Sequence, residues 1–382
     1  MSRFSTPRFV DVTPETERLK ELDHFWIQMD HCRHLDLWRF SYLSDDETGE
    51  FIPNGKARFY EPILMIHGDN SIHTIFNWFA RELWYFGFRK LFAIDRQIAG
   101  DLQIVGNRLD QIIDEIKQIT HAERISIIAH SSGGLVARYF AKFVSGADSH
   151  IRILALCGVP HDRAQYLEHL KASESSLDES QIYRALDYLE DMNATITEKE
   201  LYRLTQINLG GGLWSKTPQE GSIRYIPLSD AINISVGQTH MRIHKHKATF
   251  GTLRHLLIPN VAAFKIRLLS ITNVTKPIGI RIHYKGRITQ NYPQRGWLQI
   301  PSTLNGPFLP EAPIIIFCNS ITLDHCKAEL VIYIFEKHTL RRKSVGRVDF
   351  TLKCDELPRV DYITINGDRG EQVNLAVYTY IP

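Results

Sequence analysis

The chain has 382 residues, of which 43% are hydrophobic and 23% charged, and its formal net charge at pH 7 is +2. This composition excludes a largely disordered chain, and the length is sufficient for two domains. No apolar run is long enough to span a membrane, and residues 1–8 lack the apolar core of a signal peptide. We therefore expect a cytoplasmic protein, although secretion without a cleaved signal is compatible with the sequence. The modest charge, without clustered aromatic and basic motifs, argues against nucleic-acid binding.

The cysteines and N-terminal histidines predict neither disulfides nor a metal site. Five cysteines are scattered through the chain: Cys32, Cys157, Cys318, Cys326 and Cys354. An odd, scattered set favours reduced thiols over a disulfide framework. A further cluster consists of His24, His31, Cys32 and His34. No second Cys or His group at a zinc spacing follows it, so we expect no metal.

Residues 1–60 are predicted to form an N-terminal extension packed on a catalytic domain of residues 61–260. The extension contains a plausible helix start at Thr13, an alternating strand over 34–42 and a returning strand over 51–60. The following apolar runs predict buried strands at 62–68, 90–95, 124–130, 151–160, 202–210 and 231–237. Helical periodicity predicts helices at 74–86, 101–120 and 135–143 and a closing helix to Pro259. In the helix over 101–120, Ile104 and Leu109 are among the residues expected to face the core. This alternation indicates an α/β fold with a mostly parallel sheet covered by helices on both faces.

Residues 161–200 interrupt this alternation with charged, helix-forming sequence. Helical periodicity covers 164–172 and 179–191, and no strand is visible between them. This helical insertion is either a lid over the site or a pair of plain surface helices.

The segment Ala129-His-Ser-Ser-Gly-Gly134 joins a buried strand to a helix and has the Gly-x-Ser-x-Gly spacing of a nucleophile elbow, with Ala in the first small position. A serine at the tip of so sharp a turn has a strained backbone, and its neighbours two residues away must be small. The turn presents the Ser131 hydroxyl above the strand ends, beside the first N–H groups of the helix. The alternative is a Ser/Gly turn that only caps a helix.

Together with His67-Gly68 and Cys157-Gly-Val-Pro-His161, this segment resembles the α/β-hydrolase lipases and esterases, most closely bacterial triacylglycerol lipases. The resemblance implies Ser131 as nucleophile, with the N–H groups of Ser132 and Asp69 as oxyanion donors. The acidic Asp69 departs from the family pattern, and we expect its side chain to point away from the developing oxyanion.

The general base is expected after the last strand of the sheet, where His240 fits. His244 and His246 compete with it in the same basic segment. The triad acid is expected in a loop before the base. Glu220, in Pro-Gln-Glu-Gly, is the first candidate and Asp230 is the second; either could instead be an ordinary turn carboxylate.

Residues 261–382 change to short alternating strands, which predict an antiparallel β-sandwich. The strands are expected at 264–271, 278–284, 297–300, 314–318, 328–335, 346–352 and 372–380. The run from Glu329 to Leu352 resembles C2-type domains, but its loop carries cations where calcium-binding members carry aspartates, so no calcium site is expected. From Val261 onward there are 16 Lys and Arg against 10 Asp and Glu. The Arg341-Arg342-Lys343 tip could therefore contact a membrane surface or a protein partner, or be a soluble turn.

These patterns predict a serine hydrolase that cleaves carboxylic esters, with a lipid-like substrate, through an acyl-enzyme on Ser131 and without a cofactor. A non-catalytic, hydrolase-like adaptor protein is the alternative from another class. An acyltransferase using the same triad is a third reading, which the sequence does not separate from the first.

Overall fold

The computed structural model describes residues 27–28, 37–40, 61–68, 71–94, 102–144, 146–172, 178–194, 205–210, 226, 228, 230–236, 238–257, 261–284, 287–293, 297–300, 307–310, 314–322, 327–337, 342–353 and 357–380. The expected helix after Thr13, the strand over 51–60 and the cluster of His24, His31, Cys32 and His34 lie outside these residues. No helix in the described part of the chain is long and apolar enough to cross a membrane.

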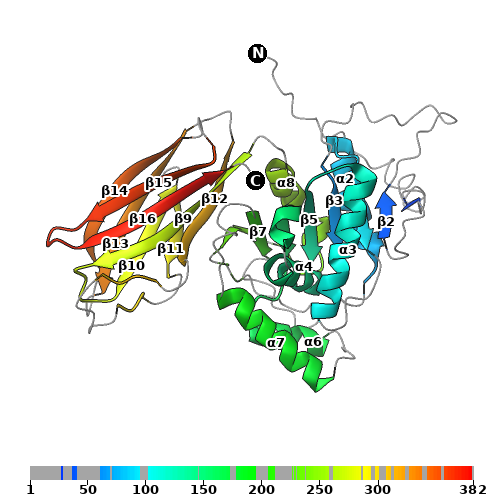
Figure 1. The fold of residues 1–382 in the computed structure, drawn as a ribbon, viewed down its shortest axis with the longest axis horizontal. Coiled ribbons are helices and arrows are strands. Elements are labelled where there is room, and N and C mark those ends of the chain that lie inside the picture. The colour runs from blue at the N-terminus through cyan, green and yellow to red at the C-terminus, as the bar shows by residue number, and fades with distance from the viewer. Residues whose placement is uncertain are drawn as a thin grey trace, which may run out of the picture.

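The first part of the chain forms an eight-stranded sheet with the order β1-β2-β4-β3-β5-β6-β7-β8 (Figure 1). Its strands are β1 Ile27–Gln28, β2 Leu37–Phe40, β3 Ile63–Ile66, β4 Leu91–Ile94, β5 Ile125–His130, β6 Ile151–Cys157, β7 Thr205–Gly210 and β8 Ala231–Ser235. The strands from β4 across to β8 pair in parallel, whereas β2 pairs antiparallel with β4 at one edge. This arrangement confirms the predicted mostly parallel sheet.

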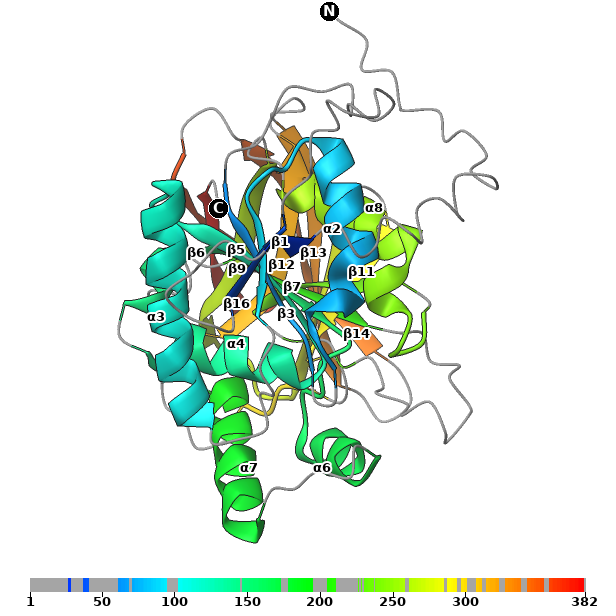
Figure 2. The ribbon, with the colours of Figure 1, turned by 90° about the vertical axis from the view of Figure 1, so that its right-hand side faces the viewer.

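Helices cover both faces of this sheet (Figure 2). They are η1 His73–Phe76, α2 Asn77–Phe86, α3 Leu102–Thr120, α4 Ser132–Phe143, α5 Ala147–His150, α6 Arg163–Ala172, α7 Glu179–Ala194, η4 Ile243–Lys245 and α8 Lys247–Leu257. Because strand side chains alternate, Leu64 and Ile66 of β3 pack in the core with α3 and α4. Ile63 and Met65 pack on the opposite face with α2 and α8. The sheet is thus packed between two hydrophobic cores, one on each of its faces.

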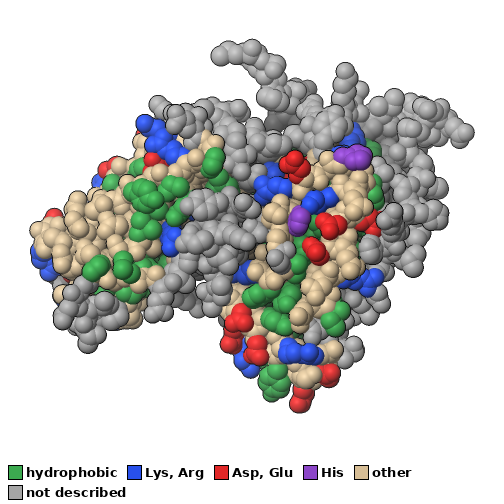
Figure 3. Space-filling view, in the orientation of Figure 1, with side chains coloured by type: hydrophobic (Ala, Val, Ile, Leu, Met, Phe, Trp, Pro, Cys, Tyr) green, Lys and Arg blue, Asp and Glu red, His purple; other side chains and the backbone are tan. Residues whose placement is uncertain are grey.

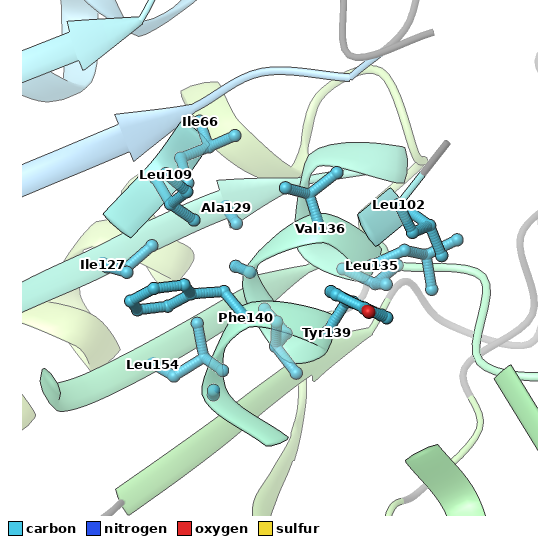
Figure 4. Close-up of a cluster of buried hydrophobic side chains, with 14 of the residues drawn as sticks. Ile66, Leu102, Leu109, Ile127, Ala129, Leu135, Val136, Tyr139, Phe140 and Leu154 are labelled. Atoms are coloured by element: carbon cyan, nitrogen blue, oxygen red, sulfur yellow. The ribbon is translucent and has the colours of Figure 1, made fainter. Parts of the chain in front are cut away.

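The core beneath α4 fixes the position of the serine turn. Phe140 of α4 is fully buried and lies near Ile127 and Leu154 of the sheet (Figure 4). Val136, one turn earlier on the same helix, is also fully buried. Burial of each such side chain contributes about 1.5–3 kcal/mol, so the start of α4 is held firmly against the end of β5.

The expectation that Ile104 faces the core was wrong, since its side chain is 70% exposed. The helix buries Leu102, Gly106 and Leu109 instead. At 3.6 residues per turn this stripe leaves position 104 on the opposite face of α3.

From Val261 onward the chain forms an antiparallel β-sandwich, as predicted. One sheet has the order β11-β10-β13-β14 and the other β12-β9-β16-β15. Their strands are β9 Val261–Thr272, β10 Ile278–Tyr284, β11 Arg287–Tyr292, β12 Ile314–Thr322, β13 Lys327–Lys337, β14 Arg342–Lys353, β15 Arg359–Asn366 and β16 Gln372–Tyr380. At the basic hairpin Lys337 pairs with Arg342, and Lys343 is exposed. Arg341 lies outside the described residues.

The sandwich differs from the prediction in three strands. The expected strand at 297–300 makes only an isolated bridge from Leu298 to Ile278. The strands β11 and β15, which pair at the edges of their sheets, were missed. The strand β11 is largely polar, so its apolar alternation is faint. The strand β15 does alternate, with Ile363 and Ile365 buried and Thr364 and Asn366 exposed.

The sandwich meets the parallel sheet through a buried polar junction. The Thr205 hydroxyl lies 3.1 Å from the Tyr380 hydroxyl, and Lys265 of β9 is 2% exposed near the same tyrosine. Burial alone would lower the pKa of Lys265, but Tyr380, Cys318 and Asp230 together raise it. Lys265 therefore stays charged between the two parts of the molecule.

Candidate active site

Ser131 lies between β5 and α4 with a backbone φ of 56° and ψ of −135°. A positive φ is uncommon for a residue other than glycine and costs on the order of 1–3 kcal/mol. The turn is held by hydrogen bonds from Ser131 N to Cys157 O at 3.1 Å and from Gly134 N to Ser131 O at 2.9 Å. The predicted strained elbow is therefore present at the carboxyl edge of the parallel sheet.

Three glycines are required by the close approach of this turn to its neighbours. A Cβ on Gly68 would lie 2.5 Å from Ser131 Cβ, so the His67-Gly68 segment is directly against the nucleophile. A Cβ on Gly133 would lie 2.4 Å from the carbonyl oxygen of His67. A Cβ on Gly134 would lie 2.1 Å from a methyl group of Val159. The His67-Gly68 motif and the serine turn thus form one packed unit around Ser131.

His240 follows β8 and reaches the same edge of the sheet. It is 9% exposed, and its ring stacks on that of His130 with centroids 4.7 Å apart and planes inclined by 27°. Its buried Nδ1 lies beside Gly158, without a well-formed hydrogen bond among the described residues. Within the described part of the chain, Ser131 Oγ contacts His169 and not His240.

Burial keeps the imidazoles of His240 and His130 neutral. Desolvation lowers the pKa of His240 well below its usual value, and the neighbouring His130 and His169 lower it further. Burial likewise lowers the pKa of His130 to about 4. A neutral imidazole at His240 is the form that can accept a proton at neutral pH.

The competing histidines have structural partners. His244 packs edge-on against Phe76, with ring centroids 6.2 Å apart, and is 3% exposed. Nδ1 of His246 accepts a hydrogen bond from Ala248 N at 3.1 Å, at the start of α8. These contacts explain both residues without a role at Ser131.

The second acid candidate, Asp230, is at the wrong edge of the sheet. Through the pairing of β5, β6, β7 and β8, His130 is level with Ile234. Asp230 lies four residues before Ile234, so about 13 Å of strand separates Asp230 from the level of His130. Its Oδ2 accepts a hydrogen bond from Gln206 at 2.6 Å and lies 4.0 Å from Lys142 Nζ. The structure therefore corrects the expectation for Asp230. Glu220 and Asp69 lie outside the described residues.

The predicted insertion consists of α6 and α7, and a buried arginine ties it to the elbow helix. Arg138 of α4 is 1% exposed and donates to Met192 O and Asn193 Oδ1, both at 3.1 Å. It also lies 3.3 Å from His161 Nδ1, while His161 Nε2 lies 3.0 Å from Asn208 Oδ1. Arginine only donates, so Nδ1 of His161 accepts and Nε2 carries the proton.

His169 of α6 is a site residue that the sequence did not indicate. Its Nε2 lies 3.5 Å from Ser131 Oγ, and its ring centroid lies 6.0 Å from that of His240. No motif surrounds it, because it lies in a charged helical segment without characteristic spacing. Only the folding of α6 over the carboxyl edge brings it to the nucleophile.

A family match includes the serine turn. Residues 87–157 match a family described as "Putative serine esterase (DUF676)". The mature form of the Bacillus licheniformis lipase BlEst2 is 17% identical, over 53% of this chain and 94% of that chain, with a TM-score of 0.43. Naproxen esterase from Bacillus subtilis is 13% identical, over 66% and 100%, with a TM-score of 0.38. A C2 domain is 7% identical, over 32% and 97%, with a TM-score of 0.22.

The parallel sheet, the strained serine between β5 and α4 and the match of residues 87–157 to a serine esterase family support a hydrolase of the esterase or lipase type. Its fold is the α/β-hydrolase fold with an added antiparallel β-sandwich.

Proposed function

We propose that the protein cleaves carboxylic esters of lipid-like substrates through an acyl-enzyme on Ser131. The observation that carries the proposal is the φ of 56° at Ser131, on a turn packed against Gly68. A protein gains nothing in stability from strain at one serine, whereas the tip of a sharp strand-to-helix turn suits a nucleophile.

In the proposed reaction His240 accepts the Ser131 proton as Oγ attacks the ester carbonyl, and then returns the proton to the leaving alcohol. Water repeats the cycle and releases the acid. The N–H groups of Ser132 and Asp69 are the proposed oxyanion donors. No cofactor takes part.

Glu220 remains the proposed acid. The buried Nδ1 of His240 has no well-formed hydrogen bond among the described residues, and an acid is what an imidazole in this role requires there. The segment after β7, which contains Glu220, continues from the carboxyl edge on which Ser131 lies. Asp230 lies at the opposite edge of the sheet from Ser131.

The lipid-like substrate is supported by apolar side chains near His240. Met241 is 58% exposed, and Ile72, at the start of η1, is 50% exposed. Ile72 directly precedes η1 and Met241 lies two residues before η4, and these two helices contact each other. Exposed apolar side chains beside a reactive serine favour an acyl chain over a charged substrate.

Labelling with a fluorophosphonate probe tests the nucleophile. We expect wild-type protein to react and Ser131→Ala to be inert, followed by a p-nitrophenyl ester series in which activity rises with acyl length. Folded wild-type protein that resists the probe, also in detergent, would favour the adaptor function.

The acid is tested separately with Glu220→Gln and Asp230→Asn. We expect Glu220→Gln to lower kcat on the order of 10³- to 10⁴-fold, because the imidazole loses its orienting charge. Asp230→Asn is expected to change the free energy of unfolding and not kcat. The reverse pattern would withdraw Glu220 as the acid.

A further inference from the structure

A second imidazole approaches the nucleophile from a part of the chain outside the sheet. His169 Nε2 lies 3.5 Å from Ser131 Oγ. The ring of His169 meets that of His240 nearly edge-on, at 67° and with centroids 6.0 Å apart. One histidine therefore contacts the hydroxyl, and the proposed base His240 lies beside that histidine.

A hydroxyl group can interact with His240 and His169 only in different ways. A serine hydroxyl has one proton to donate and two lone pairs that accept. If His240 receives the proton, His169 can interact only with a lone pair of Oγ, as a donor through Nε2–H. A donor at this place stabilises the negative charge that grows on Oγ when its proton leaves.

The helix that carries His169 is fixed to the protein on both sides of the residue. Tyr166 and Leu170 of α6 are buried in the core formed by α3 and α4. The N-terminus of the helix is capped by a hydrogen bond from Gln165 N to Asp162 Oδ1 at 2.7 Å. Gln165 Oε1 in turn accepts from His161 N at 3.2 Å. His169 is thus held over the serine before any substrate binds.

We propose that His169 is a second catalytic histidine, which donates a hydrogen bond from Nε2 to Ser131 Oγ during acyl transfer; this inference rests on the proposed acyl-enzyme function. In acylation the Oγ–H bond breaks and its proton passes to His240. The Oγ–acyl bond forms, and the alcohol leaves with that proton. His169 exchanges no proton, and its hydrogen bond to Oγ lasts through both transfers.

The test compares three variants of α6 in the full-length chain. His169→Phe keeps the ring and removes the donor, His169→Gln retains an N–H donor, and Glu168→Ala changes the exposed neighbouring side chain as a control. The readouts are the second-order rate of fluorophosphonate labelling and kcat/KM on p-nitrophenyl butyrate. Circular dichroism and Tm verify folding.

We expect His169→Phe to lower both rates about 10- to 100-fold, as loss of a hydrogen bond to a developing charge would. His169→Gln should recover part of this loss, and Glu168→Ala should match wild type.

Two results would overturn the inference alone. Unchanged rates in His169→Phe would mean that the contact has no part in the chemistry. Faster labelling in that variant would mean that His169 obstructs the serine. A wild-type protein that does not react with the probe would overturn the proposed function, and this inference with it.

Discussion

His130 holds His240 in two ways: the two rings stack with centroids 4.7 Å apart, and His130 Nε2 lies 3.0 Å from the His240 carbonyl oxygen. A carbonyl only accepts, so Nε2 of His130 carries the proton and its Nδ1 does not. The residue before the nucleophile therefore positions the backbone of the proposed base.

Replacing His130 by Phe should retain the ring contact and remove this hydrogen bond. We expect kcat on a p-nitrophenyl ester to fall about 5-fold, with KM within twofold, because a neutral hydrogen bond contributes about 1 kcal/mol. His244→Phe is the matched control, since His244 also contacts the His130 ring but makes no hydrogen bond to His240. Equal losses of kcat in the two variants would contradict the positioning role.

Two glycine-to-alanine substitutions are expected to change the stability of the protein in opposite directions. Gly68→Ala places a Cβ 2.5 Å from Ser131 Cβ, and we expect loss of probe labelling together with a lower Tm. Gly251→Ala, within α8, meets no atom within 4 Å and should stabilise the protein by about 0.5–1 kcal/mol. Thermal unfolding of both variants measures the difference, and a labelled Gly68→Ala protein would refute the close packing.

Arg138 should be far more important to stability than an exposed arginine of the same region. Arg138→Met leaves the buried Met192 carbonyl and Asn193 side chain without this donor, and we expect a loss of about 3 kcal/mol in urea unfolding. Arg163→Ala removes an ion pair with Glu190 whose side chains are 49% and 62% exposed. That variant should stay within about 0.5 kcal/mol of wild type. Similar losses in both would contradict the anchoring of α7 by Arg138.

Acid should destabilise the protein through its buried histidines. Burial lowers the pKa of His130 to about 4 and that of His161 to about 3. The unfolded chain protonates these side chains near pH 6.5 and the folded state does not, so the free energy of unfolding falls as the pH drops below about 6.5. For His130 the loss is complete below about pH 4 and amounts to about 3 kcal/mol. Urea titrations from pH 7 to pH 4 measure it.

The control for this prediction is His130→Phe, which should unfold with a shallower dependence on pH over the same range. An unchanged slope in that variant would show that other groups carry the acid sensitivity.

The sequence predicted those parts of the fold that are marked by a pattern of neighbouring residues. Ser131 was predicted because a strand, a small-residue turn and a helix follow one another within a few residues. Ile104 was placed wrongly although Leu109 was placed correctly, because at 3.6 residues per turn position 104 lies about 140° around the helix from position 109. The edge strand β11 was missed because its side chains are largely polar, whereas β15 was missed although Ile363 and Ile365 alternate with exposed residues.

The site was predictable where it follows the order of strands, and not where it depends on packing. His240 follows from its position after β8. Asp230 was misplaced although the strand from residue 231 was predicted, because a residue just before a parallel strand lies at the opposite edge of the sheet from one just after it. His169 was missed because nothing local marks a helix that folds back over a distant serine.

The positive charge of Lys265 acts on both the sandwich and the parallel sheet. It is supplied by the first strand of the sandwich, yet it helps to keep the pKa of Asp230 low against the cost of burial, together with Lys142 and Arg138. A fragment that ends at residue 260 would lose this cation and uncover the Thr205 hydroxyl. Exchange of the sandwich with that of another protein would succeed only if the incoming strands brought a lysine and a tyrosine to the same two places. The two parts are therefore expected to be inherited, and to unfold, as one unit.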